Sequence, residues 1–328
     1  MAVPIWKDYY VDFGNVTSVD YEIRLTDGSI VFSGRSYRRP DDVSLQVKIN
    51  DICADYLATL TDGKPNLAEG FQSNDIAKEF RIFNSSGTLI DTVTFVNDWS
   101  YDHDKQDNGV LSDPINRIFD VRMPLLYSIS KAQTINIDAQ DTKADFNIDF
   151  SADFSIGNDR IWTVEAAGAG TLTLKNIFTE TGDVKVGNTM YHGITSCHTH
   201  ALYYVNAYGG WDFLLLEGRT IETDSYTRHE HKQEYDNRDV ANRGTKNYLN
   251  EVAKSYVLHT GWLVGDQASK IHHLLGSVEV YLFEIQSQRM IPVTMTDNSC
   301  KYKTFQNEGG KLVEYEINVK VAKQMIRR

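Results

Sequence analysis

The stretch SVDYEIRLTDGSIVFSGRSY, residues 18–37, decides the fold class of this chain. Tyr21, Ile23 and Leu25 alternate with polar residues, which is the period of a strand with one buried face. Asp27 and Gly28 then provide the positive-φ turn that tight hairpins prefer. The stretch therefore predicts an antiparallel β-hairpin.

A second stretch, KEFRIFNSSGTLIDTVTFV at residues 78–96, repeats this pattern with a turn at 84–87. Between the two hairpins, apolar residues at 49–57 fall at three- and four-residue spacing, which predicts a short amphipathic helix. Two hairpins with one buried face each make an antiparallel sheet, and we expect the helix to cap it.

Strand signals continue through the second half of the chain. We expect a strand pair in WTVEAAGAGTLTLKNIF at 162–178, and a hairpin buried on both faces in THALYYVNAYGGWDFLLLEGRT at 199–220, reversing at Gly209 and Gly210. A short helix is predicted at 266–275, with Asp266 as its N-cap. LVEYEINVKV at 312–321 alternates strictly and predicts a closing strand.

The length of 328 residues suits two packed domains. We expect a mainly β, α+β protein with antiparallel sandwich or barrel-like domains, a few short helices and long polar arms. The expected domains are 1–155, with the helix at 49–57, and 156–328, with a polar arm at about 219–250 and the helix at 266–275.

Composition excludes several functional classes. The net charge of -12 argues against a surface that grips nucleic acid, because phosphate binding needs clustered Lys and Arg. Cys53, Cys197 and Cys300 are scattered and form neither a disulfide framework nor a CxxC pair. The first residues lack the pattern of a secretory signal and no run is long enough to span a bilayer, so we expect a soluble protein made in the cytosol.

Motifs of catalysis are absent from the sequence: it has no GxSxG, no GxxxxGK[ST], no GxGxxG after a strand and no HExxH. We therefore expect no enzyme and predict no catalytic or cofactor-binding residues. Two HxH pairs, His198 with His200 and His229 with His231, have strand spacing that suits a metal. They lack an acidic partner at the spacing of hydrolase motifs, so we interpret them as polar or interface residues and predict no metal site.

The segment at 220–250 is long, charged and without clear alternation, and we expect an extended arm or loop that contacts a neighbouring subunit. Its mixed charges gain little as core but can pair across an interface, and its tyrosines can anchor such a contact. The predicted interface residues are Arg219, Tyr226, Arg228, Tyr235, Arg238, Arg243, Tyr248 and, outside the segment, Trp211.

The order of parts in the C-terminal half resembles tail and ring proteins of Bacteroidetes phages, in particular the ring proteins of crAss-like phages. The segments that carry the resemblance are YGGWDFLLLEG at 208–218, TGWLVGDQASKIHHLLGSVEVYL at 260–282, IPVTMTD at 291–297 and the closing strand that ends in Arg327 and Arg328. None of them is a catalytic signature.

This resemblance implies a structural virion protein that forms a ring or layer of the tail or connector barrel under the portal. The implied partners are copies of the chain, other tail, portal or ring proteins, and DNA that passes through the channel without specific binding; no membrane is implied. The protein would be made in the host cytoplasm and reside in the virion tail. The alternatives are a carbohydrate-binding or adhesion β module, with Trp99, Trp162, Trp211 and Trp262 as candidate stacking rings, and a metal-dependent hydrolase.

Overall fold

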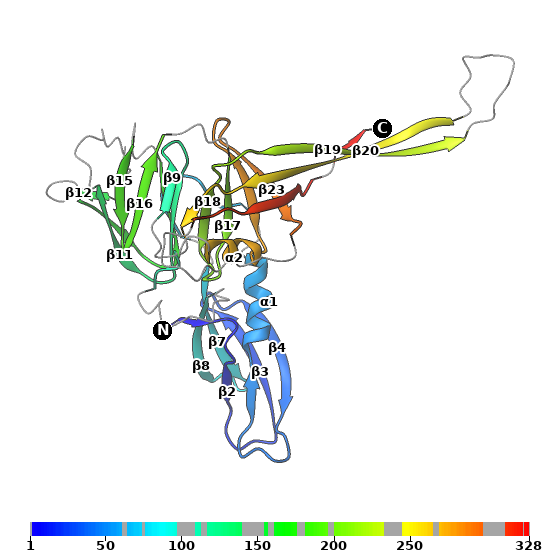
Figure 1. Ribbon diagram of the computed structural model, residues 1–328. Helices are drawn as coiled ribbons and strands as arrows, with labels where there is room; N and C mark the ends of the chain where they lie inside the picture. Colours follow the sequence, from blue (N-terminus) through cyan, green and yellow to red (C-terminus); the bar gives the residue numbers. More distant parts are fainter. Residues whose placement is uncertain are drawn as a thin grey trace. The chain divides into compact units, whose positions relative to one another are not determined.

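The chain forms two compact units that share a mostly β architecture (Figure 1). The computed structural model describes residues 2–60, 64–73, 76–96, 109–112, 117–139, 154–156, 161–175, 181–195, 200–232, 245–264, 269–297, 312–323 and 325–327. Unit 1 comprises Met1–Cys197, Tyr204–Phe213 and Gly276–Glu279, and unit 2 comprises His198–Tyr203, Leu214–Leu275 and Val280–Arg328. The predicted β-rich α+β class is confirmed.

Unit 1 begins with a five-stranded sheet built on the two predicted hairpins. Its strands, in spatial order, are β1 (Ala2–Pro4), β8 (Leu89–Val96), β7 (Ala77–Asn84), β3 (Ser18–Leu25) and β4 (Ile30–Tyr37). Gly28 and Gly87 hold the turns with φ of 86° and 76°, a region that only glycine enters at no steric cost. Both hairpin predictions are therefore confirmed.

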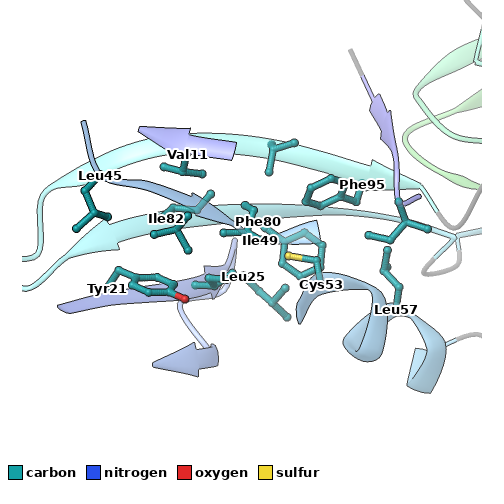
Figure 2. Packing of buried hydrophobic residues seen from close by; sticks show 14 residues of the cluster. Val11, Tyr21, Leu25, Leu45, Ile49, Cys53, Leu57, Phe80, Ile82 and Phe95 are labelled. Carbon is teal, nitrogen blue, oxygen red and sulfur yellow. The ribbon is translucent and has the colours of Figure 1, made fainter. Parts of the chain in front are cut away.

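The helix α1 (Asn50–Leu60) packs its apolar side chains against the inner face of this sheet (Figure 2). Cys53 and Leu57 of α1 are fully buried in one cluster with Phe80 and Phe95 of the sheet. Burial raises the pKa of the Cys53 thiol to about 12, so this cysteine is a small apolar core residue. A two-stranded sheet of β2 (Tyr10–Asp12) and β5 (Gln46–Lys48) adds Val11 and Val47 to the same core.

Two further sheets complete the strands of unit 1. One holds β10 (Leu125–Ile129), β14 (Gly170–Leu174) and β6 (Gly70–Ser73); the other holds β12 (Phe154–Ile156), β13 (Ile161–Ala166), β11 (Gln133–Ala139), β15 (Gly182–Val186), β16 (Thr189–Ile194) and β9 (Arg117–Asp120). The strands β13 and β14 both exist as predicted, but they do not pair with each other. The predicted strand pair is wrong because β13 finds its partner in β11 and β14 finds its partner in β10.

The boundary expected at 155/156 falls inside unit 1. The expected boundary cuts through strand β12. This strand pairs antiparallel with β13, which follows it in the chain, so both belong to one sheet. A break between them would leave a row of unpaired backbone groups. Unit 1 instead continues to Cys197 and gains two later segments of the chain.

The largest sheet contains most strands of unit 2, and two of its strands, β17 and β18, include residues of both units. Its order is β18 (Trp211–Leu215), β17 (His200–Val205), β22 (Val280–Glu284), β23 (Arg289–Met295), β25 (Glu316–Val321), β20 (Thr245–His259) and β19 (Ile221–Lys232), and β26 (Met325–Arg327) also pairs with β20. Almost every residue of β17 and β18 is buried, as predicted for this hairpin. Burial raises the pKa of the Tyr203 hydroxyl well above its usual value.

The remaining elements of unit 2 are short. Helix α2 (Ser269–Leu275) confirms the second predicted helix, although its expected N-cap, Asp266, lies outside the described residues. The predicted closing strand is divided, because β24 (Leu312–Val313) pairs with β21 (Leu263–Val264) while β25 joins the large sheet. Neither described helix combines the length and the apolar run that a membrane crossing requires.

A buried ion pair lies within unit 1 and was not predicted. The Arg117 guanidinium on β9 donates to the carboxylate of Asp212 on β18, and both side chains are 0% exposed. Asp212 also accepts the backbone N–H of Phe213 at 2.6 Å. The guanidinium carbon lies 5.6 Å from the Tyr191 ring centroid and 5.8 Å from that of Phe213, so aromatic rings cover the pair.

Asn206 organises the turn that follows β17, also within unit 1. Its Oδ1 accepts the backbone N–H groups of Tyr208 and Gly210, each at 3.0 Å. Its Nδ2 donates to the Leu111 carbonyl at 2.8 Å and lies 3.4 Å from Oδ2 of Asp212. The side chain therefore connects the turn to the buried ion pair.

The turn packs so closely that a side chain at position 210 is excluded. A Cβ on Gly210 would lie 2.8 Å from Ser128 Cβ and 2.9 Å from both Leu111 Cβ and the Leu111 carbonyl oxygen. Ser128 Oγ accepts the Trp211 N–H at 3.1 Å, and the Leu111 carbonyl accepts from Asn206, so neither residue can move without losing a hydrogen bond.

We expect Gly210→Ala to lower the free energy of unfolding by about 1–3 kcal/mol, because the added methyl group overpacks a fully buried turn. Urea unfolding followed by tryptophan fluorescence measures the loss. Gly168→Ala is the matched control, since a Cβ there meets nothing within 4 Å, and it should leave stability unchanged or slightly raised. Equal stability of the two variants would contradict the close packing at Gly210.

Candidate assembly interface

The segment predicted as an arm forms a long two-stranded ribbon of β19 and β20 (Figure 1). The two strands pair antiparallel along the whole of β19, from Ile221 opposite Val257 to Lys232 opposite Thr245. The other edge of β20 pairs with β26 over 250–252 and with β25 over 255–259. Among the described residues, 245–249 pair only with β19, so this part of the ribbon leaves the sheet as two strands.

The expected extended arm or loop is a two-stranded hairpin over its described residues. The sequence shows little alternation there because neither face of the outer ribbon is buried, so the usual apolar signal of a strand is missing. Backbone pairing inside the ribbon supplies the order that apolar burial supplies elsewhere. Residues 233–244 lie outside the described part of the chain.

Aromatic side chains stand on the ribbon in contact with solvent. Tyr226 is 60% exposed and Tyr248 is 55% exposed, while most side chains of β19 are exposed as well. Ile221 is 40% exposed at the beginning of β19. Exposed tyrosines surrounded by polar residues are the composition of a protein-binding surface.

An ion-pair cluster lies where the ribbon joins the sheet. Lys254 Nζ of β20 donates to Glu222 Oε1 of β19 and lies 3.9 Å from Asp224 Oδ1. The hydrogen bond with Glu222 raises the pKa of Lys254 above its usual value. The sequence alone does not reveal this cluster, because only the register of the two strands places Lys254 between the two acids.

A β-bulge shapes the outer part of the ribbon. The register shifts between His229 and Glu230, which leaves Tyr248 as the extra residue on β20. The rings of His229 and His231 lie with their centroids 6.1 Å and 5.9 Å from that of Tyr248. Glu251 Oε1 lies 3.3 Å from His229 Nε2. The HxH pair thus flanks an exposed aromatic ring.

The other histidine pair is only partly described. His200 lies on β17, with its ring centroid 6.2 Å from that of Tyr256, and burial lowers its pKa below the usual value. Cys197 and His198 lie outside the described residues. Over the described ranges, no group of three or more His, Cys, Asp or Glu side chains is placed to hold a metal ion.

The predicted interface residues have three different locations. Tyr226, Arg228 and Tyr248 are exposed on the ribbon, and Arg219 is exposed just before β19. Trp211 is only 8% exposed and packs inside unit 1, so it has little surface left for a partner. Tyr235, Arg238 and Arg243 lie outside the described residues.

The tryptophans proposed for a glycan platform divide in a similar way. Trp262 is 65% exposed and Trp211 is buried. Trp99 lies outside the described residues, and the structure describes the strand position of Trp162 but not its side chain. A stacking platform needs exposed rings, which Trp262 offers and Trp211 does not.

The chain matches no protein-family model, and no curated protein shows a detectably similar sequence.

Proposed function

We propose that the chain is a structural subunit of a tailed-phage virion, forming a ring or layer of the tail or connector barrel, and that the β19–β20 ribbon is the element that contacts neighbouring subunits. The observation that carries this proposal is the ribbon itself, in which β19 is exposed on both faces and Tyr226 of β19 and Tyr248 of β20 stand in contact with solvent. The resemblance of the C-terminal segments to phage ring proteins supports the same class.

The ribbon suits a binding role because it is ordered before any partner arrives. Binding by an unstructured arm must include the entropic cost of fixing its backbone, about 1–2 kcal/mol per residue. The paired strands of the ribbon already fix their backbones within the chain. More of the contact energy of the tyrosines and charged side chains therefore remains for association.

The acidic composition fits a subunit around a DNA channel. A net charge of -12 repels phosphates, which keeps a passing duplex from adhering to the walls. On this proposal DNA is a cargo, and the stable partners are protein subunits.

Removing the outer ribbon tests the proposal directly. Replacing residues 228–250 with Asn-Gly would join Thr227 to Glu251, which lie opposite each other, through a two-residue hairpin turn. We expect the shortened chain to fold and to keep a strand-dominated circular dichroism spectrum. The intact protein should form rings or layers on a negative-stain grid, and the shortened chain should not. Normal assemblies from the shortened chain would contradict the role of the ribbon.

Point variants separate contact from folding. Tyr226→Ser and Tyr248→Ser should each weaken association by roughly tenfold or more, as loss of an aromatic anchor does. Tyr37→Ser is the matched control, since Tyr37 is 68% exposed on β4 in the other unit and should be replaceable without effect. A chain that stays monomeric, and whose spectroscopic signal changes when glycans are titrated in, would favour the carbohydrate-binding alternative.

A further inference from the structure

The strand β19 ends the order of the large sheet, and among the described residues only β20 pairs with it. Its outer edge is twelve residues long. Free edges of this kind present a row of backbone N–H and C=O groups that can pair with another strand. The edge is therefore a binding surface whose partner must be an extended segment.

Proteins usually protect such edges by shortness, proline, a bulge or charges of one sign. The strand β19 is long and lacks proline, and the extra residue of its bulge belongs to β20. Its charges are of both signs, with acidic Glu222, Asp224 and Glu230 against Arg228 and Lys232. A mixed set of this kind can pair with a copy of itself.

Alternate residues of a strand share one face, so Asp224, Tyr226 and Arg228 project together. When two copies of β19 run antiparallel about a two-fold axis through Tyr226, Asp224 of each copy faces Arg228 of the other. Tyr226 then faces its own copy as a cross-strand aromatic pair. Opposite charges and aromatic pairs at directly opposed positions stabilise antiparallel strands.

The register shifted by one residue, with Thr227 opposite its own copy, is less favourable. It would pair Glu222 with Lys232, but it would place Asp224 against Glu230, lose the Tyr226 aromatic pair, and leave Asp224 with a cation, Lys254, only at 3.9 Å. The register through Tyr226 instead places Glu230 against Glu222, whose charge Lys254 already compensates by a direct hydrogen bond. The register through Tyr226 therefore combines the Asp224–Arg228 pairs with an aromatic pair, and the one like-charge pair in it already has a cation bound to Glu222.

We infer that β19 pairs with β19 of a second copy of this chain, antiparallel and with Tyr226 at the two-fold axis, to give a continuous four-stranded ribbon. The inference rests on the proposed function, since it names the partner of the same ribbon. A two-fold contact of this type closes on itself and joins two subunits, so in a ring assembly it links one ring or layer to the next.

A single cysteine at the axis tests the pairing. Residues directly opposed in antiparallel strands have Cα atoms roughly 4.5–5.5 Å apart, within the range that a disulfide bridges. In a full-length Cys197→Ser/Cys300→Ser background, Tyr226→Cys should convert most of the protein to a disulfide-linked dimer on mild oxidation. Cys53 remains in place because it is buried.

Two control variants distinguish the proposed register from other contacts between the strands. Thr227→Cys should not cross-link, because its copy would lie about 7–8 Å away on the diagonal. Tyr37→Cys, 68% exposed on β4, reports random collisions between molecules and should also form no disulfide-linked dimer. Cross-linking at Thr227 instead of Tyr226, or equally fast at Tyr37, would overturn the inference.

Charge exchange provides a second, independent readout. Asp224→Arg and Arg228→Asp should each weaken self-association by about tenfold, since each places like charges in opposition twice. A mixture of the two variants should recover association as mixed dimers, in which every Arg again faces an Asp. Arg219→Asp, exposed and outside β19, is the control and should have no effect.

The outcomes separate this inference from the proposed function. Rings or layers that form normally without a Tyr226→Cys cross-link and without charge-exchange rescue would disprove the β19 pairing and leave the structural role standing. A protein that forms neither assemblies nor cross-links would disprove both.

Discussion

Replacing Asp212 with alanine is expected to lower the free energy of unfolding by about 3–5 kcal/mol, which is the typical cost of removing one partner from a buried ion pair. The change removes the Asp212 carboxylate from the Arg117 guanidinium, which is 0% exposed and lies against the rings of Tyr191 and Phe213. The Phe213 N–H also loses its acceptor. Urea unfolding followed by circular dichroism measures the loss.

Two controls identify the buried charge as the cause. The double variant Arg117→Met/Asp212→Leu replaces the whole pair by apolar side chains and should recover much of the lost stability, because no guanidinium then remains buried beside the missing carboxylate. Asp20→Ala breaks an exposed ion pair, in which Arg35 Nε lies 2.5 Å from Asp20 Oδ1. This variant should change stability little, because solvent screens the two charges. Equal losses from Asp212→Ala and Asp20→Ala would refute the assignment.

The second large effect is expected for Asn206→Ala. The variant removes the acceptor of two buried N–H groups, those of Tyr208 and Gly210, and the donor to the Leu111 carbonyl. Each buried polar group left without a partner costs about 1–3 kcal/mol, so we expect a loss of about 3 kcal/mol or more. Thermal unfolding monitored by circular dichroism measures this loss of stability.

The chain contains its own matched control for this variant. Asn84 caps the surface hairpin of β7 and β8 by the same pattern, accepting the N–H groups of Ser86 at 3.1 Å and Thr88 at 2.9 Å. In Asn84→Ala water can replace the lost acceptor, so we expect a loss of about 1 kcal/mol or less. Similar losses from the two variants would show that burial is not the source of the Asn206 effect.

The same comparison shows what local sequence encodes. Asn84 with Gly87 and Asn206 with Gly209 stand at the same spacing, and both glycines adopt a positive φ, 76° and 84°. A turn of this kind depends on residues within five positions of one another. The sequence therefore predicted these hairpins, the hairpin at Gly28 and both helices, since strand alternation and helical spacing are local signals.

The candidate interface was only partly predictable. Tyr226, Arg228 and Tyr248 could be selected because a mixed-charge segment with tyrosines gains little as core. Trp211 was selected for its residue type, yet it lies in a run buried on both faces. Residue type alone does not separate an interface aromatic from a core aromatic, because both classes use the same side chains.

By itself the sequence determined the β-rich class, the hairpins, the helices and the exposed polar character of residues 221–232, all of which follow from the type and spacing of residues near one another. The tertiary structure decided which strands pair, as β13 with β11 and β14 with β10, and it decided the pairing of Arg117 with Asp212, 95 residues apart. It also placed Lys254 between Glu222 and Asp224, and among the described strands it paired β19 with β20 alone. These features depend on contacts between distant segments, whose partners are selected by side-chain packing and backbone hydrogen bonding across the whole fold.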